Sequence, residues 1–112
     1  MNGTLLVWPI WLVWHLPLFA FLTDFQNMGV ATAVFGWSLG LVAGTMVLAN
    51  VSHVAGGSVV AAAIWHMLFN AAAGPGMSPL ASAVATTLVM LWAIIIGIAA
   101  WRGRSSLLSV GP

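Results

Sequence analysis

Three polar residues inside apolar stretches are the part of this sequence that could do chemistry. His15 lies within "TLLVWPIWLVWHLPLFAFL", and His66 and Asn70 lie within "AAAIWHMLFNAAA". An ionisable side chain in hydrocarbon costs a few kcal/mol, so it usually faces a partner or water inside a helix bundle. His66 and Asn70 are four residues apart and share one helical face, as Trp11 and His15 do. We therefore expect His15 and His66 to face each other across a polar pocket.

These residue types suit more than one kind of chemistry. An imidazole can accept a proton as a general base, whereas an asparagine can donate a hydrogen bond to developing negative charge. Two histidines without a carboxylate or thiolate make a poor zinc site, so we expect no cofactor. His15 and His66 could instead be axial ligands of a haem held between facing helices. The plainest interpretation is two structural histidines bonded to backbone carbonyls or to Asn70.

The composition predicts an integral membrane protein. Of 112 residues, 62% are hydrophobic and only 3% are charged, and the mean hydropathy is +1.13. The formal charge of +1 comes from Arg102 and Arg104 against Asp24, which gives nucleic-acid binding no support. Without cysteine, the chain can form no disulfide, thiolate metal site or cysteine nucleophile.

The apolar segments are separated by short polar or glycine-containing turns, and a bilayer core needs about 20 apolar residues per helix. We expect a single all-α domain over residues 1–112, an integral membrane bundle of about four transmembrane helices. Its predicted helices span about 4–22, 30–49, 58–73 and 78–101, followed by a cytoplasmic tail at 102–112. His53 is predicted to lie in the turn "NVSHVAGG", at the membrane edge.

The two arginines predict the orientation of the bundle. Arg102 and Arg104 directly follow the last predicted span, and cytoplasmic flanks carry an excess of such residues. The C-terminus is therefore expected in the cytoplasm, and four crossings return the N-terminus to the same side of the membrane.

A stripe of small residues marks one face of the second predicted helix. Gly36, Gly40 and Gly44 recur every four residues, which lets another helix approach closely. We expect this face to pack within the bundle rather than to form a dimer.

Two segments resemble motif blocks of the CAAX prenyl protease and bacteriocin-processing (CPBP, or Abi) family of intramembrane endopeptidases. "WLVWHLPLF" resembles the F-x-x-x-H block, with Trp11 in the phenylalanine position and His15 as the histidine. "GSVVAAAIWHMLFNAA" resembles the H-x-x-x-N block through His66 and Asn70. The resemblance covers residues 5–75.

The resemblance implies hydrolysis of peptide bonds near the cytoplasmic face of the bilayer, on a peptide or membrane-protein substrate. In the family, a glutamate activates water and is assisted by the histidine that matches His15. The residues that match His66 and Asn70 stabilise the oxyanion. A zinc mechanism is also written for this family.

The chain departs from the family at the E-E-x-x-x-R motif, which supplies the glutamate. The sequence contains no glutamate, and only fourteen residues precede His15. Asp24 is nine residues further along, roughly 13 Å away on a continuous helix. We therefore expect a truncated or degenerate member, with an upstream segment or a partner supplying the glutamate. The alternatives are a non-catalytic membrane relative, such as a bacteriocin self-immunity protein, and the bis-histidine haem protein.

Overall fold

The computed structural model describes residues 2–74 and 76–103, and every regular element among them is a helix. The all-α prediction is confirmed for this part of the chain. The elements are α1 (Asn2–His15), α2 (Leu18–Phe21), α3 (Thr23–Gln26), the π-helical η1 (Thr32–Trp37), α4 (Ser38–Val54), α5 (Val59–Ala73) and α6 (Pro79–Trp101). Arg104 and most of the predicted tail lie outside the described residues.

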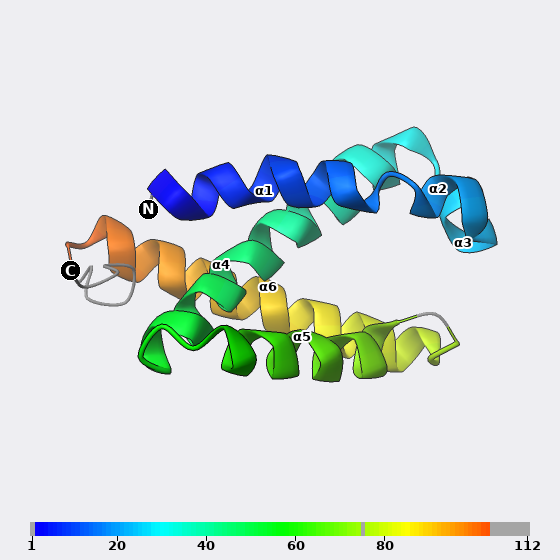
Figure 1. Ribbon diagram of the computed structural model, residues 1–112. Helices are drawn as coiled ribbons and strands as arrows, with labels where there is room; N and C mark the ends of the chain where they lie inside the picture. The colour runs from blue at the N-terminus through cyan, green and yellow to red at the C-terminus, as the bar shows by residue number, and fades with distance from the viewer. Residues whose placement is uncertain (1, 75, 104–112) are drawn as a thin grey trace.

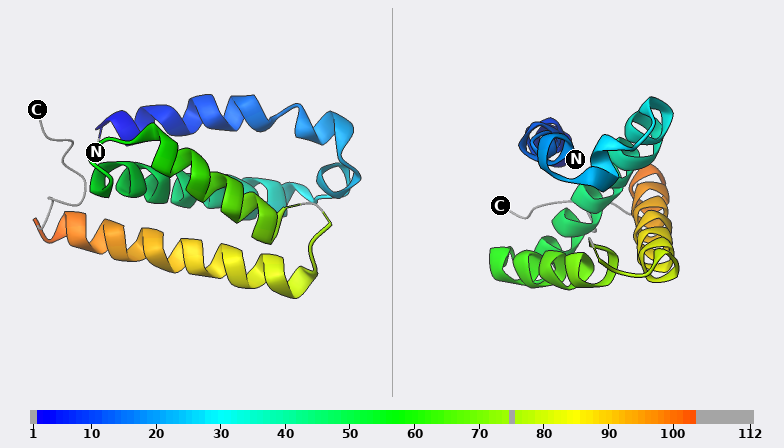
Figure 2. Two further views of the ribbon diagram at one scale, coloured as in Figure 1. Left: turned by 60° about the horizontal axis from the view of Figure 1, so that its bottom comes forward. Right: turned by 90° about the vertical axis from the view of Figure 1, so that its right-hand side faces the viewer.

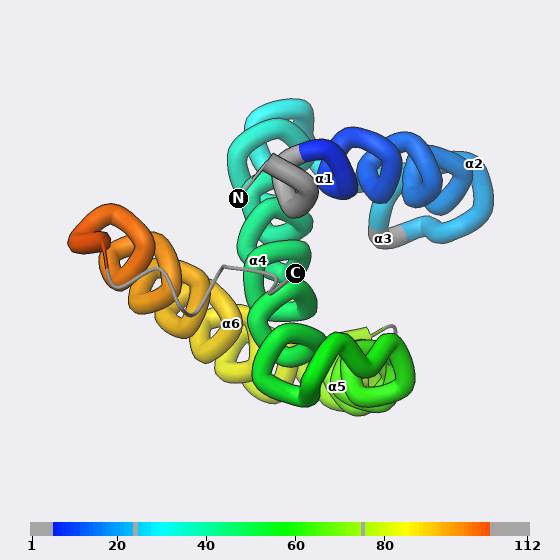
Figure 3. The backbone as a smooth tube through the Cα atoms, turned by 60° about the vertical axis from the view of Figure 1, so that its left-hand side comes forward, coloured from blue at the N-terminus to red at the C-terminus, as the bar shows by residue number. Residues whose placement is uncertain are grey.

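Helix α4 is the central element. It packs against α1, α5 and α6, and α5 also packs against α6 (Figures 1 and 3). The molecule measures 43 × 23 × 22 Å, and its helices run roughly along the longest dimension (Figure 2). The start of α1 and the end of α6 lie at one end of the molecule, and α2 and α3 lie at the other (Figure 1).

The buried core lies where α4 crosses α6. It consists of Ala43 and Val47 from α4 with Val89, Ala93 and Ile96 from α6. Alanine at this crossing leaves room for the two backbones to approach, as is common between membrane helices. All five residues of this core come from α4 and α6, so these two helices form the most closely packed pair.

The outer surface is strongly apolar. Most large hydrophobic side chains are exposed, including Phe21 at 81%, Val30 at 80% and Trp101 at 86%. Two helical stretches, Thr32–Val54 and Pro79–Trp101, are long and apolar enough to cross a membrane, whereas Leu6–Phe21 and Val59–Ala73 are shorter.

The predicted first helix, 4–22, is interrupted. Helix α1 ends at His15, and the chain makes a turn at residues 16 and 17 before α2 begins. Pro17 has no amide hydrogen, and it disfavours helical backbone at the residue before it. The interruption turns Phe19 toward η1, where its ring packs against that of Trp37.

The predicted second helix, 30–49, continues further than expected. Helix α4 ends at Val54, so the prediction that His53 lies in a turn is wrong. The segment "NVSHV" contains no helix breaker, and the left-handed backbone that ends the helix first occurs at Gly56 (φ 67°) and Gly57 (φ 86°). His53 is half-buried in the last turn of α4.

The last two helices lie close to their predicted bounds because each has a clear start signal. The hydroxyls of Ser58 and Ser78 accept hydrogen bonds from the amides of Ala61 and Ala81, at 3.2 Å each. Pro79 occupies the first turn of α6, where no amide hydrogen is needed.

Candidate functional site

The Trp11 indole contacts both His15 and His66. Its ring centroid lies 5.4 Å from that of His15, in an edge-on arrangement, and 5.0 Å from that of His66. His15 is on the same helix as Trp11, whereas His66 comes from α5. The fold therefore brings both histidines to one aromatic side chain.

The Trp11 indole also packs against helix α4. A Cβ atom built on Gly44 would lie 3.6 Å from Cζ3 of Trp11, which is van der Waals contact. The prediction that this glycine packs within the bundle is confirmed. A Cβ on Gly40 would meet nothing within 4 Å, and one on Gly36 would meet only Thr32 of its own helical segment. The close approach is therefore limited to one of the three glycines.

The His15 ring is held in one tautomer. Its Nδ1 atom lies 2.7 Å from the main-chain oxygen of Trp11. A carbonyl oxygen can only accept a hydrogen bond, so Nδ1 carries the proton. The neutral ring then has its lone pair on Nε2, which can accept a proton or bind an electrophile.

The contact between His66 and Asn70 is looser. Nδ2 of Asn70 lies 3.4 Å from Nε2 of His66, at the long end for a hydrogen bond. The predicted pairing along one face of the helix is observed. Asn70 is exposed and His66 is half-buried, so the amide is the member of the pair that an incoming group would reach first.

Sequence reasoning missed a second group of aromatic residues near His15. The ring centroid of Trp37, from η1, lies 6.4 Å from that of His15, 5.1 Å from that of Phe19 and 6.0 Å from that of Phe25. No spacing rule links Trp37 to these residues, because they belong to different helices. His15 thus lies close to two tryptophan rings.

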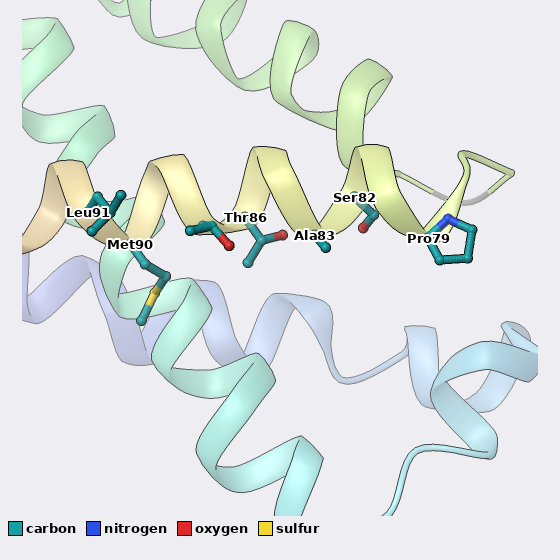
Figure 4. A pocket seen from close by; sticks show the side chains of 7 residues that line it. Pro79, Ser82, Ala83, Thr86, Met90 and Leu91 are labelled. Carbon is teal, nitrogen blue, oxygen red and sulfur yellow. The ribbon is translucent and has the colours of Figure 1, made fainter.

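The surroundings differ from the polar pocket that was predicted. Both histidines contact an indole, and neither lines the two hollows seen among the described residues. One is an open hollow along α6 that includes Ser82, Thr86 and Met90 (Figure 4), and the other lies between α4 and α6. Each histidine contacts the same aromatic ring, that of Trp11, whereas the prediction was that they face each other across a polar pocket.

The cofactor hypotheses can be tested against these side chains. Among the described residues, no group of three or more histidine, cysteine, aspartate or glutamate side chains is placed to hold a metal ion. A haem between His15 and His66 would have to occupy the space of the Trp11 indole that both rings contact. The haem alternative therefore stays a prediction, and it would require this indole to move.

No family model, curated protein or solved structure matches the chain. What the chain can do chemically therefore rests on Trp11, His15, His66 and Asn70 and on the two motif segments that contain them.

Proposed function

We propose that the chain is a membrane-embedded helical bundle carrying part of a peptide-hydrolysing site of the CPBP type. The observation that carries this proposal is the packing of His15 and His66 on one indole, with Asn70 beside His66. These are the residues that the two motif resemblances select. They come from separate helices, so chance spacing along one helix does not explain their proximity.

The surface supports a membrane location. The core contains few buried side chains, while leucine, isoleucine, valine and tryptophan side chains cover the outside of the helices. In water such a surface would favour aggregation, whereas in lipid it needs no cover. The 43 Å length is close to the roughly 40–45 Å thickness of a bilayer with its headgroups.

The arrangement of the helices supports the proposed orientation. The start of α1 and the end of α6 share one end of the molecule, where the exposed Arg102 follows α6 (Figure 1). Cationic residues favour the cytoplasmic side. Both termini are then cytoplasmic in a multi-pass protein.

The chemistry assigns different tasks to the two histidines. Nε2 of His15 carries a lone pair and can accept a proton from a water molecule, whose oxygen then attacks a peptide carbonyl carbon. Asn70 can donate hydrogen bonds through its amide to the oxygen that becomes negative. Nε2 of His66 accepts from the Asn70 amide, so the neutral His66 ring carries its proton on Nδ1 and can donate from that nitrogen.

The proposed site is incomplete in this sequence, which has no glutamate. A general base contributes about 10²- to 10⁴-fold to the rate, and a carboxylate beside an imidazole also stabilises its charged form. We propose that a further segment or a partner supplies the carboxylate. The chain by itself then hydrolyses peptides too slowly to separate from the background.

The test uses the full chain reconstituted in lipid nanodiscs, with quenched fluorescent peptides and a prenylated CAAX peptide as probes. Wild type and His15→Ala are compared, alone and preceded by a helix bearing E-E-x-x-x-R. A Q-Q-x-x-x-R version is the matched control. We expect cleavage only from the glutamate-bearing chain with His15 intact. Strong cleavage by the unextended chain, lost in His15→Ala, would show that the glutamate is not needed.

The missing glutamate also favours a second candidate function, a non-catalytic membrane partner such as a bacteriocin self-immunity protein. That candidate predicts that the glutamate-bearing chain remains inactive. It also predicts that His15→Ala and Asn70→Ala together leave protection of cells from a bacteriocin unchanged.

A further inference from the structure

A wide, π-helical segment directly precedes α4. Residues Thr32–Trp37 form the π-helix η1. The amide of Ser38 donates to the carbonyl of Ala33, five residues back, and the Ser38 hydroxyl donates to the carbonyl of Val34, four residues back. The hydroxyl thus bonds the carbonyl that the Ser38 amide would reach in an α-helix. π-Helical turns are rare and occur frequently at functional sites.

The wide turn determines where Trp37 points. One residue of an α-helix corresponds to a rotation of about 100°, so a π-helical insertion turns the residues on one side of it by about that angle relative to those on the other. Trp37 is the last residue of η1, and its ring packs against Phe19 and Phe25 as well as His15. In an uninterrupted α-helix, the direction of this side chain relative to the residues before η1 would differ by about this angle.

Two tryptophans consequently contact the His15 ring. Trp11 binds Nδ1 through its main-chain oxygen and contacts the ring with its indole. Trp37 approaches the ring at an interplanar angle of 66°. Without Trp37, the imidazole would have room to rotate about its side-chain bonds and leave the carbonyl of Trp11.

We infer that Trp37 is a positioning residue for His15 and that the π-helical turn, held by Ser38, brings it there. Trp37 keeps Nδ1 on the Trp11 carbonyl, so that Nε2 remains the unprotonated nitrogen. The importance of this for hydrolysis rests on the proposed function, whereas the restraint itself is a property of the fold.

The test measures the tautomer of His15 directly. The full chain, labelled with ¹⁵N-histidine and reconstituted in nanodiscs, is examined by NMR at about pH 9, where free imidazole is neutral. His15→Gln assigns the signals. We expect separate signals for a protonated and an unprotonated ring nitrogen in wild type. In Trp37→Leu, we expect these to merge toward an average, while Trp37→Phe retains most of the separation.

Two further variants test the wide turn and the specificity of the effect. Deletion of Ala33 removes the extra residue of η1, and we expect it to merge the signals as Trp37→Leu does. Trp101→Leu is the matched control, because Trp101 is 86% exposed at the end of α6. Separate His15 signals in Trp37→Leu, or equal merging in Trp101→Leu, would overturn the inference.

The outcome is distinguishable from that of the proposed function. If Trp37→Leu merges the signals but the glutamate-bearing chain hydrolyses no peptide, the positioning role stands and the hydrolase proposal fails. If that chain hydrolyses peptides but the His15 signals do not respond to Trp37→Leu, the positioning role fails alone.

Discussion

The Trp11 indole of α1 packs against the His66 imidazole of α5 with their ring centroids 5.0 Å apart. This contact connects the two segments that resemble CPBP motifs. It also crosses the surface of α4, where Gly44 leaves room for the indole. The packing of α1 and the geometry of the proposed site therefore depend on the same side chain.

Gly44→Leu is expected to destabilise the fold, while Gly40→Leu is not. A Cβ atom at Gly44 is already in contact with Trp11, so a longer side chain pushes α1 away, at a cost of about 1–3 kcal/mol. A Cβ atom at Gly40 would have no neighbour within 4 Å. Gly40→Leu should therefore change the free energy of unfolding by no more than about 0.5 kcal/mol. Reversible unfolding in mixed detergent measures both values. Equal losses of unfolding free energy in the two variants would show that Gly44 is not specifically required for the packing of α1 on α4.

Ile96→Ala is expected to cost about 2–5 kcal/mol, because it leaves a cavity in the α4–α6 core. Ile96 is 2% exposed, whereas its neighbour Ile95 is 63% exposed and supplies the same substitution at the surface. Ile95→Ala should cost much less in the same unfolding measurement. A larger loss for Ile95→Ala would mean that α6 presents its other face to the bundle.

Asn70→Ala is expected to leave stability almost unchanged, within about 0.5 kcal/mol. The residue is exposed, and its contact with His66 is long. In the glutamate-bearing chain, the same substitution should lower peptide cleavage by about 10²- to 10³-fold, the usual effect of removing one oxyanion donor. Met67→Ala, on the same helix and also exposed, is the control. Unchanged cleavage in Asn70→Ala would remove the amide from the proposed site.

Reporter fusions test the orientation in cells. A fluorescent protein that matures only in the cytoplasm should be active after residue 112, and a phosphatase that folds only outside should be active after residue 26. The physical reason is the retention of Arg102 and Arg104 on the cytoplasmic side. A phosphatase that is active after residue 112 would reverse the orientation.

Much of the fold could be predicted from local sequence signals. Ser58, Ser78 and Pro79 mark the starts of α5 and α6, and the helices begin where these residues predict. The pairing of His66 with Asn70 also follows from spacing alone, since residues four apart meet on any α-helix. These features depend only on a few neighbouring residues.

The inward faces of the helices could not be predicted in this way. A helix that is apolar all round has no polar stripe to identify its exposed side, so periodicity does not say which residues meet across helices. The exposed Leu6 and Ile10 and the half-buried Trp11 belong to the same apolar run. Which of these residues is buried depends on how α1 packs against the other helices.

The sequence by itself determined that the described chain is helical, that its surface is apolar, and that His15, His66 and Asn70 lie within its helices. Only the tertiary structure decided that Trp11 contacts both His15 and His66 and that Trp37, at the end of a π-helical segment, also contacts His15. Helix formation depends on hydrogen bonds between residues four apart, whereas these contacts depend on how separate helices pack.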